Sequence, residues 1–154
     1  MAICDLSALS GLLAPDARLM GLDLGAKTIG VAVSDVSRTI ATARTTIRRT
    51  RLSRDIETLR AMIAAEGIGG IVVGLPVNMD GSEGPRAQSA RDTAARLAEA
   101  LALPVAFWDE RLSTVAAERP LLDADLSRRK RARVVDRVAA AYILQGALDR
   151  LRAG

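Results

Sequence analysis

The chain of 154 residues contains no histidine and a single cysteine, Cys4. Without imidazole there is no histidine general base, no Ser-His-Asp triad and no zinc site built on histidine. A single cysteine excludes an internal disulfide and a metal site made of clustered cysteines. Any enzymatic chemistry must therefore depend on carboxylates, hydroxyls, lysine and arginine.

Aromatic residues and long apolar runs are also scarce. Phe, Trp and Tyr together make up 2% of the chain, which disfavours binding of nucleic acid by stacking bases on exposed rings. No apolar run approaches the length needed to span a bilayer. The first residues lack the basic start of a signal peptide, so we expect a cytoplasmic protein.

What remains is an ordinary globular composition with a modest excess of positive charge. Hydrophobic residues make up 49% and charged residues 26%, and the formal net charge is +4. That balance favours an anionic partner such as nucleic acid. The length suits one domain, and we expect a single domain over residues 18–154 preceded by an N-terminal extension, residues 1–17.

The stretch from Met20 to Asp35 contains the most unusual residue of the sequence. Its pattern predicts two strands, over residues 18–24 and 29–34, joined by a tight turn. Asp23 lies in the middle of the first strand, in a run otherwise suited to burial. A buried carboxylate is costly unless it is paired or binds a cation.

Strand alternation places Asp23 on a face of small residues. Residues two apart in a strand share a face, so the face of Asp23 carries Gly21 and Gly25 and the next strand contributes Gly30, Ala32 and Ser34. Bare backbone leaves room for a phosphate chain to approach. The alternative interpretation is that Asp23 pairs with a nearby Lys or Arg or caps the turn.

The rest of the chain predicts alternating helices and strands. Expected strands cover residues 39–47, 68–75 and 104–108, and expected helices cover residues 52–66, 86–103, 113–122 and 133–151. This order predicts an α/β fold with a mixed five-stranded sheet flanked by helices. We expect the first strand to lie centrally and to pair with the apolar run at residues 68–75.

This topology can bring three acids together. Asp23 lies on the central strand, Glu110 at the end of a neighbouring strand, and Asp136 in the first turn of the last expected helix. Converging carboxylates repel one another unless cations bind between them, and oxygen ligands suit Mg²⁺ or Mn²⁺. Two such ions can support phosphodiester hydrolysis. The alternative for Asp136 is that it only complements the helix dipole.

Several residues near these acids could contact phosphates. Two basic segments, Arg44 to Arg54 and Arg128 to Arg133, are expected to flank the site, and a polar loop at residues 76–85 follows a predicted strand. The candidate substrate residues are Lys27, Thr28, Asn78, Arg111, Arg128, Arg129, Lys130 and Arg131. Each of them also has an ordinary interpretation as turn or surface chemistry.

Four blocks of the sequence resemble the YqgF/RuvX family, namely GLDLGAKTIGVAVSD, IVVGLPVNMDGSEGPRA, DERLSTVAAE and VDRVAAAYIL. The resemblance covers about Met20 to Leu151. It implies a ribonuclease H-like fold, with Asp23, Glu110 and Asp136 matching the family's acidic residues. The family is described as a Holliday junction resolvase and as a nuclease that matures the 5′ end of pre-16S ribosomal RNA.

Two features depart from related nucleases. The extension over residues 1–17 lies outside the resemblance, so nothing carries over to it. Junction resolvases of this fold also place two acids three residues apart on the last helix, whereas Ala139 follows Asp136 at that spacing. This difference weakens the case for strong two-metal catalysis and for resolvase activity in particular.

The resemblance favours a metal-dependent nuclease acting on structured RNA, with ribosomal precursor particles as partners. A resolvase acting on branched DNA would have to be a homodimer so that two sites cut symmetric strands, and the sequence itself allows a monomer or a homodimer. Actin-like ATPases share the fold but need a second domain, for which the length leaves no room. A nucleic-acid binder without catalysis is disfavoured by the three acids.

Overall fold

The computed structural model describes residues 3–112 and 128–153, with side chains omitted for residues 128–135. The helix expected over residues 113–122 lies outside the described residues. Within the described part of the chain, no helix is both long and apolar enough to cross a membrane.

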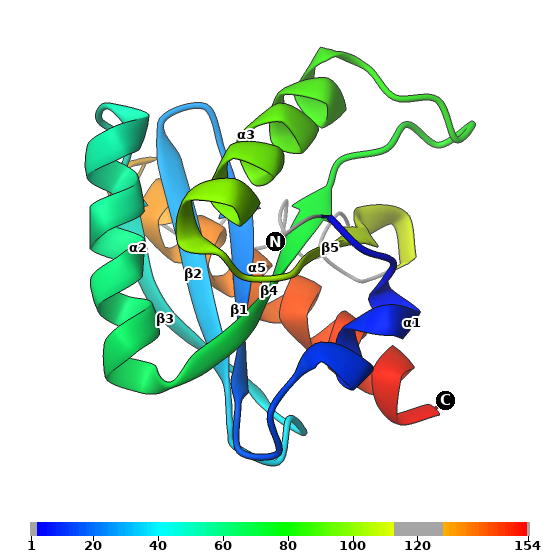
Figure 1. The fold of residues 1–154 in the computed structure, drawn as a ribbon. Helices are drawn as coiled ribbons and strands as arrows, with labels where there is room; N and C mark the ends of the chain where they lie inside the picture. Colours follow the sequence, from blue (N-terminus) through cyan, green and yellow to red (C-terminus); the bar gives the residue numbers. More distant parts are fainter. Residues whose placement is uncertain (1–2, 113–127, 154) are drawn as a thin grey trace.

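Five strands form one mixed sheet (Figure 1). Its order is β3 (Ala41–Arg48), β2 (Thr28–Ser34), β1 (Arg18–Leu24), β4 (Ile68–Leu75) and β5 (Val105–Asp109). The first three strands pair antiparallel through short turns, and β1, β4 and β5 pair parallel. The predicted central position of the first strand and its pairing with residues 68–75 are confirmed.

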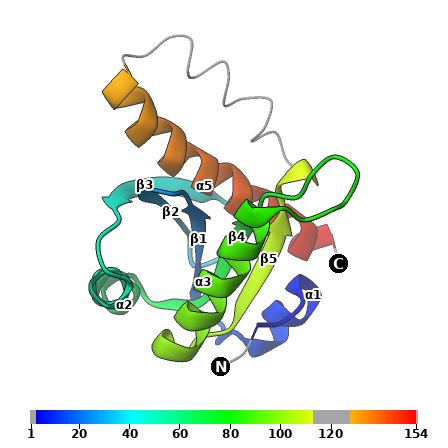
Figure 2. The ribbon, with the colours of Figure 1, turned by 90° about the horizontal axis from the view of Figure 1, so that it is seen from above.

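Helices cover both faces of the sheet (Figure 2). One face packs against α2 (Leu52–Glu66) and α3 (Pro85–Leu101), and the other packs against α5 (Arg128–Ala153). α2 ends where Gly67 adopts the left-handed conformation with φ 66°, which glycine adopts without steric cost. α3 begins with Pro85 at its first position, where the missing backbone N–H is not needed.

The N-terminal residues pack against the edge of the sheet at β5. They form α1 (Leu6–Leu9) and a 3-10 turn, η1 (Ser10–Leu12). Leu9 is fully buried in the core beneath α5, and the Cys4 N–H donates to the Val105 carbonyl at 2.9 Å. These contacts cover part of an edge that would otherwise be open to pairing with another chain.

The largest difference from the predicted elements is at the start of the last helix. It begins at Arg128 rather than at residue 133, because Arg, Lys and Ala are good helix formers and the basic run continues the helix. Asp136 therefore lies more than one turn inside α5, and the prediction that it occupies the first helical turn is wrong. The other differences are shifts of one or two residues at the start of β2, at the ends of β3, α3 and β5, and at the C-terminal end of α5.

Candidate active site

Asp23 lies on the face of the sheet covered by α5. It is 6% exposed and pairs across strands with Gly30. Its neighbour on the same face, Gly21, lies directly under α5, since a Cβ there would come within 2.7 Å of Leu144 Cβ. The predicted face of small residues is thus the surface on which α5 rests, and Asp23 continues that face toward the end of β1.

Asp136 lies over the cross-strand partner of Asp23. A Cβ added to Gly30 would overlap the Asp136 carbonyl and lie 3.0 Å from the Arg137 nitrogen, so the α5 backbone crosses β2 at this glycine. The Thr28 hydroxyl donates a short hydrogen bond to the Asp136 carboxylate. The first residue of β2 thereby fixes one orientation of the Asp136 side chain.

Glu110 approaches from the other side of β1. In the parallel pairing Leu22 lies opposite Val73, so Gly74 is beside Asp23. A Cβ on Gly74 would lie 3.4 Å from the Glu110 carboxyl carbon. Glu110 begins η2 (Glu110–Leu112), the 3-10 turn that follows β5. The two strands that flank Asp23 therefore each carry a glycine beside it. Asp136 comes close at Gly30 on β2, and Glu110 comes close at Gly74 on β4.

The donor atoms of this site are all carboxylate oxygens, which suit a hard cation such as Mg²⁺ or Mn²⁺. The carboxylates lie farther apart than the ligands of an assembled metal site. Within residues 3–112 and 136–153, no group of three Asp, Glu or Cys side chains is close enough to hold a metal ion. Asp136 accepts from Thr28, and Asp23 and Glu110 each have interactions of their own. The residues fit such an ion in their chemistry, but their side chains would have to move closer together to hold it.

The other predicted substrate residues differ in their surroundings. Lys27 is exposed in the turn between β1 and β2. Asn78 is exposed, and its side-chain amide donates to Ser82 Oγ at 3.0 Å. Arg111 pairs with Asp109. The side chains of Arg128, Arg129, Lys130 and Arg131 lie outside the described residues, although their backbone belongs to α5.

Part of the basic segment Arg44 to Arg54 has a structural role. Arg44 pairs with Glu66 at 2.8 Å. Arg49 supports the turn beside the site, since its guanidinium donates to the Gly25 carbonyl at 2.7 Å and its backbone N–H to the Lys27 carbonyl at 2.8 Å. Sequence reasoning missed this role of Arg49, and no local pattern indicates it because the partners are more than twenty residues apart.

The residues on either side of Glu110 form an ion pair. Both carboxylate oxygens of Asp109 accept from the Arg111 guanidinium, with a shortest distance of 2.7 Å. Hydrogen bonding from Arg111 holds the pKa of Asp109 below its usual value of 3.8. Asp109 was missed from the sequence, although an acid two residues before an arginine at a strand end could have indicated the pair.

The chain is similar in sequence to known proteins over most of its length. The profile of the RuvX family, described as Holliday junction resolvase, matches residues 17–150. A protein of Paramagnetospirillum magneticum named "Putative pre-16S rRNA nuclease" is 63% identical over 137 residues, which are 89% of this chain and 88% of that protein. A protein of Cereibacter sphaeroides with the same name is 65% identical over 133 residues, covering 86% of this chain and 83% of that protein.

A solved structure shows the same fold at much lower identity. The chain of T. thermophilus RuvC in complex with a Holliday junction substrate matches with a TM-score of 0.55 and 13% identity. The match covers 90% of this chain and 96% of the RuvC chain. The predicted α/β, ribonuclease H-like architecture is thereby confirmed.

Proposed function

The chain belongs to the RuvX family, and from that premise we propose that it is a metal-dependent nuclease that processes the 5′ end of precursor 16S rRNA in the cytoplasm. One observation carries the proposal most directly. Asp23 is a nearly buried carboxylate at the last position but one of the central strand, and Glu110 and Asp136 approach the glycines beside it on either side. A strand selected only for stability would have an apolar residue at this position.

The three acids are the proposed catalytic and metal-binding residues. Asp23, Glu110 and Asp136 would hold Mg²⁺ or Mn²⁺, which supplies Lewis acidity and an activated water for phosphodiester hydrolysis. Gly30 and Gly74 let α5 lie close to the sheet, since the Asp136 carbonyl takes the Cβ position at Gly30 and the Ile143 side chain takes it at Gly74. The space expected on this face for a phosphate chain is thus filled by α5.

Exposed cations at the same end of the sheet would attract the nucleic-acid backbone. Lys27 lies in the turn after β1, and Arg48, which is exposed, pairs in register with Thr28 at the start of β2. Contacts of this kind hold phosphates without reading sequence. They support a substrate recognised by its backbone and shape, such as a structured RNA or, in an assembling ribosome, a precursor particle.

The second candidate function is resolution of Holliday junctions, which the description of the matching family profile favours. It would use the same acids. It would also need two copies of the chain so that two sites cut symmetric strands.

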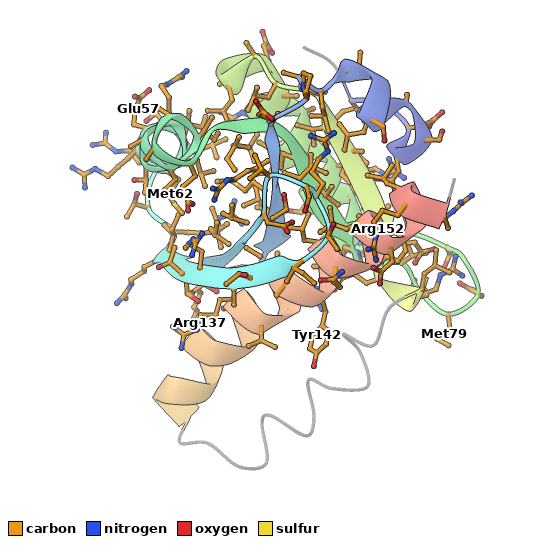
Figure 3. All side chains as sticks on the ribbon, turned by 90° about the horizontal axis from the view of Figure 1, so that it is seen from below. Glu57, Met62, Met79, Arg137, Tyr142 and Arg152 are labelled. Carbon is orange, nitrogen blue, oxygen red and sulfur yellow. The ribbon has the colours of Figure 1, made fainter. Side chains whose placement is uncertain are left out.

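The test compares both substrates with purified protein. A labelled RNA that contains the 16S 5′ leader and, separately, a four-way DNA junction are incubated with Mg²⁺, Mn²⁺ or EDTA. Asp23→Asn removes the charge of the buried acid. Glu57→Gln is the matched control, because Glu57 is an exposed acid on α2, 67% accessible at its side chain and on the opposite side of the sheet (Figure 3).

Cutting of the RNA alone, dependent on metal and abolished by Asp23→Asn but retained in Glu57→Gln, is the expected result. Symmetric cutting of the junction would assign the resolvase function instead. If neither substrate is cut although both are bound, the acids are not sufficient for catalysis and the proposal fails.

A further inference from the structure

Arg111 carries a positive charge that suits a phosphate contact, but its surroundings indicate a structural role. We call this role a clamp, because the side chain holds two segments of the chain together. Arg111 follows Glu110 directly, and its guanidinium is already engaged on two sides. The geometry points to Arg111 as a positioning residue that joins the turn carrying Glu110 to the loop at residues 76–84, which we call the β4 loop. This inference rests on the proposed nuclease function and adds how one of its acids is held.

The first side of the clamp is Asp109. The Arg111 Nε lies 3.1 Å and 3.0 Å from the two Asp109 carboxylate oxygens, and Nη2 lies 2.7 Å from Oδ2. The backbone N–H of Arg111 also donates to Asp109 Oδ1 at 2.9 Å. A carboxylate that accepts from the backbone two residues on closes an Asx turn, and the residue enclosed by this turn is Glu110.

The second side of the clamp is the tip of the β4 loop. Arg111 Nη1 donates to the Met79 carbonyl at 3.3 Å, and the same nitrogen would lie 3.6 Å from a Cβ on Gly81, which has φ 90°. Figure 3 shows Met79 at this loop, and the residue is 89% exposed. Arg111 therefore fixes the backbone of the tip and leaves the Met79 side chain to solvent.

The β4 loop is otherwise closed by its own hydrogen bonds. The Asn78 N–H donates to the Ser82 carbonyl and the Gly81 N–H to the Asn78 carbonyl, both at 2.9 Å. Asp80 Oδ1 accepts from the backbone and hydroxyl of Ser82 at 2.9 and 2.6 Å. These bonds set the shape of the loop, whereas the Met79 carbonyl is where Arg111 ties its tip to the turn after β5.

A clamp and a phosphate contact predict different things. Each of the three guanidinium nitrogens of Arg111 has a protein acceptor, and its side chain is one-third exposed, at 33%. These bonds use three of the five N–H donors of the guanidinium and fix its orientation, so a phosphate could reach only the two donors that remain. A clamp instead keeps the β4 loop and Glu110 in a fixed relation while substrate binds.

The experiment measures the loop and the binding separately. The variants are Arg111→Gln, Arg111→Lys, Asp109→Asn and the Arg111→Gln/Asp109→Asn double variant, with Lys27→Gln as the reference for loss of a phosphate contact. Hydrogen–deuterium exchange reports opening of residues 76–84 without any nuclease activity. Affinity for a labelled RNA is measured across a series of salt concentrations, since loss of one phosphate contact lowers the slope of log K against log salt by about one.

The clamp predicts at least about tenfold faster exchange in the β4 loop for both Arg111→Gln and Asp109→Asn, with no further increase in the double variant. Arg111→Lys keeps the charge but loses the two-sided geometry, so its loop should also exchange faster. The salt slope should stay that of the wild type, kcat should fall, and KM should change little.

Two results would overturn the clamp. One is unchanged loop exchange in Arg111→Gln and Asp109→Asn. The other is a salt slope that falls by about one in Arg111→Gln, as in Lys27→Gln, which would make Arg111 a phosphate ligand. If the wild type cuts no substrate while the variants still loosen the β4 loop, the clamp stands and the proposed function fails.

Discussion

Substituting Gly30 by alanine tests whether the crossing of α5 over β2 is as close as the structure indicates. Gly30 is buried between the sheet and the helix, and its absent Cβ is the space that the Asp136 carbonyl occupies. The new methyl group would meet backbone rather than a flexible side chain. α5 would have to move away from the sheet to accommodate it.

The size of the effect follows from the packing. In an unstrained position, replacing glycine by alanine stabilises a protein by about 0.4–1 kcal/mol through the unfolded state. Overpacking a well-filled interface costs about 1–3 kcal/mol, and here the obstacle cannot rotate away. We expect Gly30→Ala to lose about 2–3 kcal/mol of unfolding free energy, which lowers Tm by about 4–12 °C for a chain of this size.

Two further glycines supply matched controls for urea and thermal unfolding. Gly11 is exposed, and a Cβ added there would meet no atom within 4 Å, so Gly11→Ala should be neutral or slightly stabilising. Gly21 lies under the same helix but farther along it, where a Cβ would come within 2.7 Å of Leu144 Cβ and 2.9 Å of the Ala140 carbonyl. Gly21→Ala should therefore destabilise the fold to a similar extent.

Nuclease activity distinguishes the substitution at Gly30 from the substitution at Gly21. At a temperature where both variants are folded, Gly30→Ala should lose at least about tenfold more activity than Gly21→Ala, since only the former displaces Asp136 directly. A Gly30→Ala protein as stable as Gly11→Ala and fully active would refute the close crossing. Equal activity in Gly30→Ala and Gly21→Ala would refute the placement of Asp136 in the site.

Other parts of the fold give three further predictions. Asp55 is 2% exposed and accepts from the backbone and hydroxyl of Thr50 before α2, so Asp55→Ala should lose about 1–3 kcal/mol in urea unfolding; a loss below about 0.5 kcal/mol would contradict this role. Trp108 Nε1 is buried without a hydrogen-bond partner among the described residues. In thermal unfolding, the unfolding free energy of Trp108→Phe should therefore stay within about 1.5 kcal/mol of the wild type, whereas Trp108→Ala should lose about 3–5 kcal/mol. The Thr39 backbone N–H lowers the pKa of Asp35 below its usual 3.8, so this carboxylate stabilises the fold above that pH and the stabilisation disappears as pH falls through its folded pKa. Urea unfolding should therefore show a deficit for Asp35→Asn at about pH 6 that vanishes at the acid end of the titration, and a constant deficit would be inconsistent with it.

The sheet was predictable because its strands are defined by local pattern. Residues 68–75 form a continuous apolar run between Gly67 and Pro76, and the structure places β4 on those residues in the interior of the sheet. The alternation around Asp23 likewise predicted which face of β1 consists of small residues. Patterns of this kind work because burial on one or both faces selects side chains within a few positions of each other.

The approximate placement of the three acids could be predicted from the sequence, but the contacts that support them could not. Asp136 was placed one turn too close to the helix start, because a basic run looks like a surface loop while being compatible with a helix. The hydrogen bonds of Thr28 and Arg49 join residues that are 108 and 24 positions from their partners. No periodicity encodes such contacts, since they depend on where distant elements meet.

The closeness of α5 to Gly30 has a consequence for how the protein is made. All five strands precede α5 in the chain, so a ribosome completes the sheet residues before it synthesises the helix that carries Asp136. Until then the face with Gly21, Gly30 and Gly74 is an apolar surface open to water, and Asp23 has no Asp136 beside it. Asp136 can join Asp23 and Glu110 only after α5 has been synthesised, so a chain that still lacks this helix carries two of the three proposed acids.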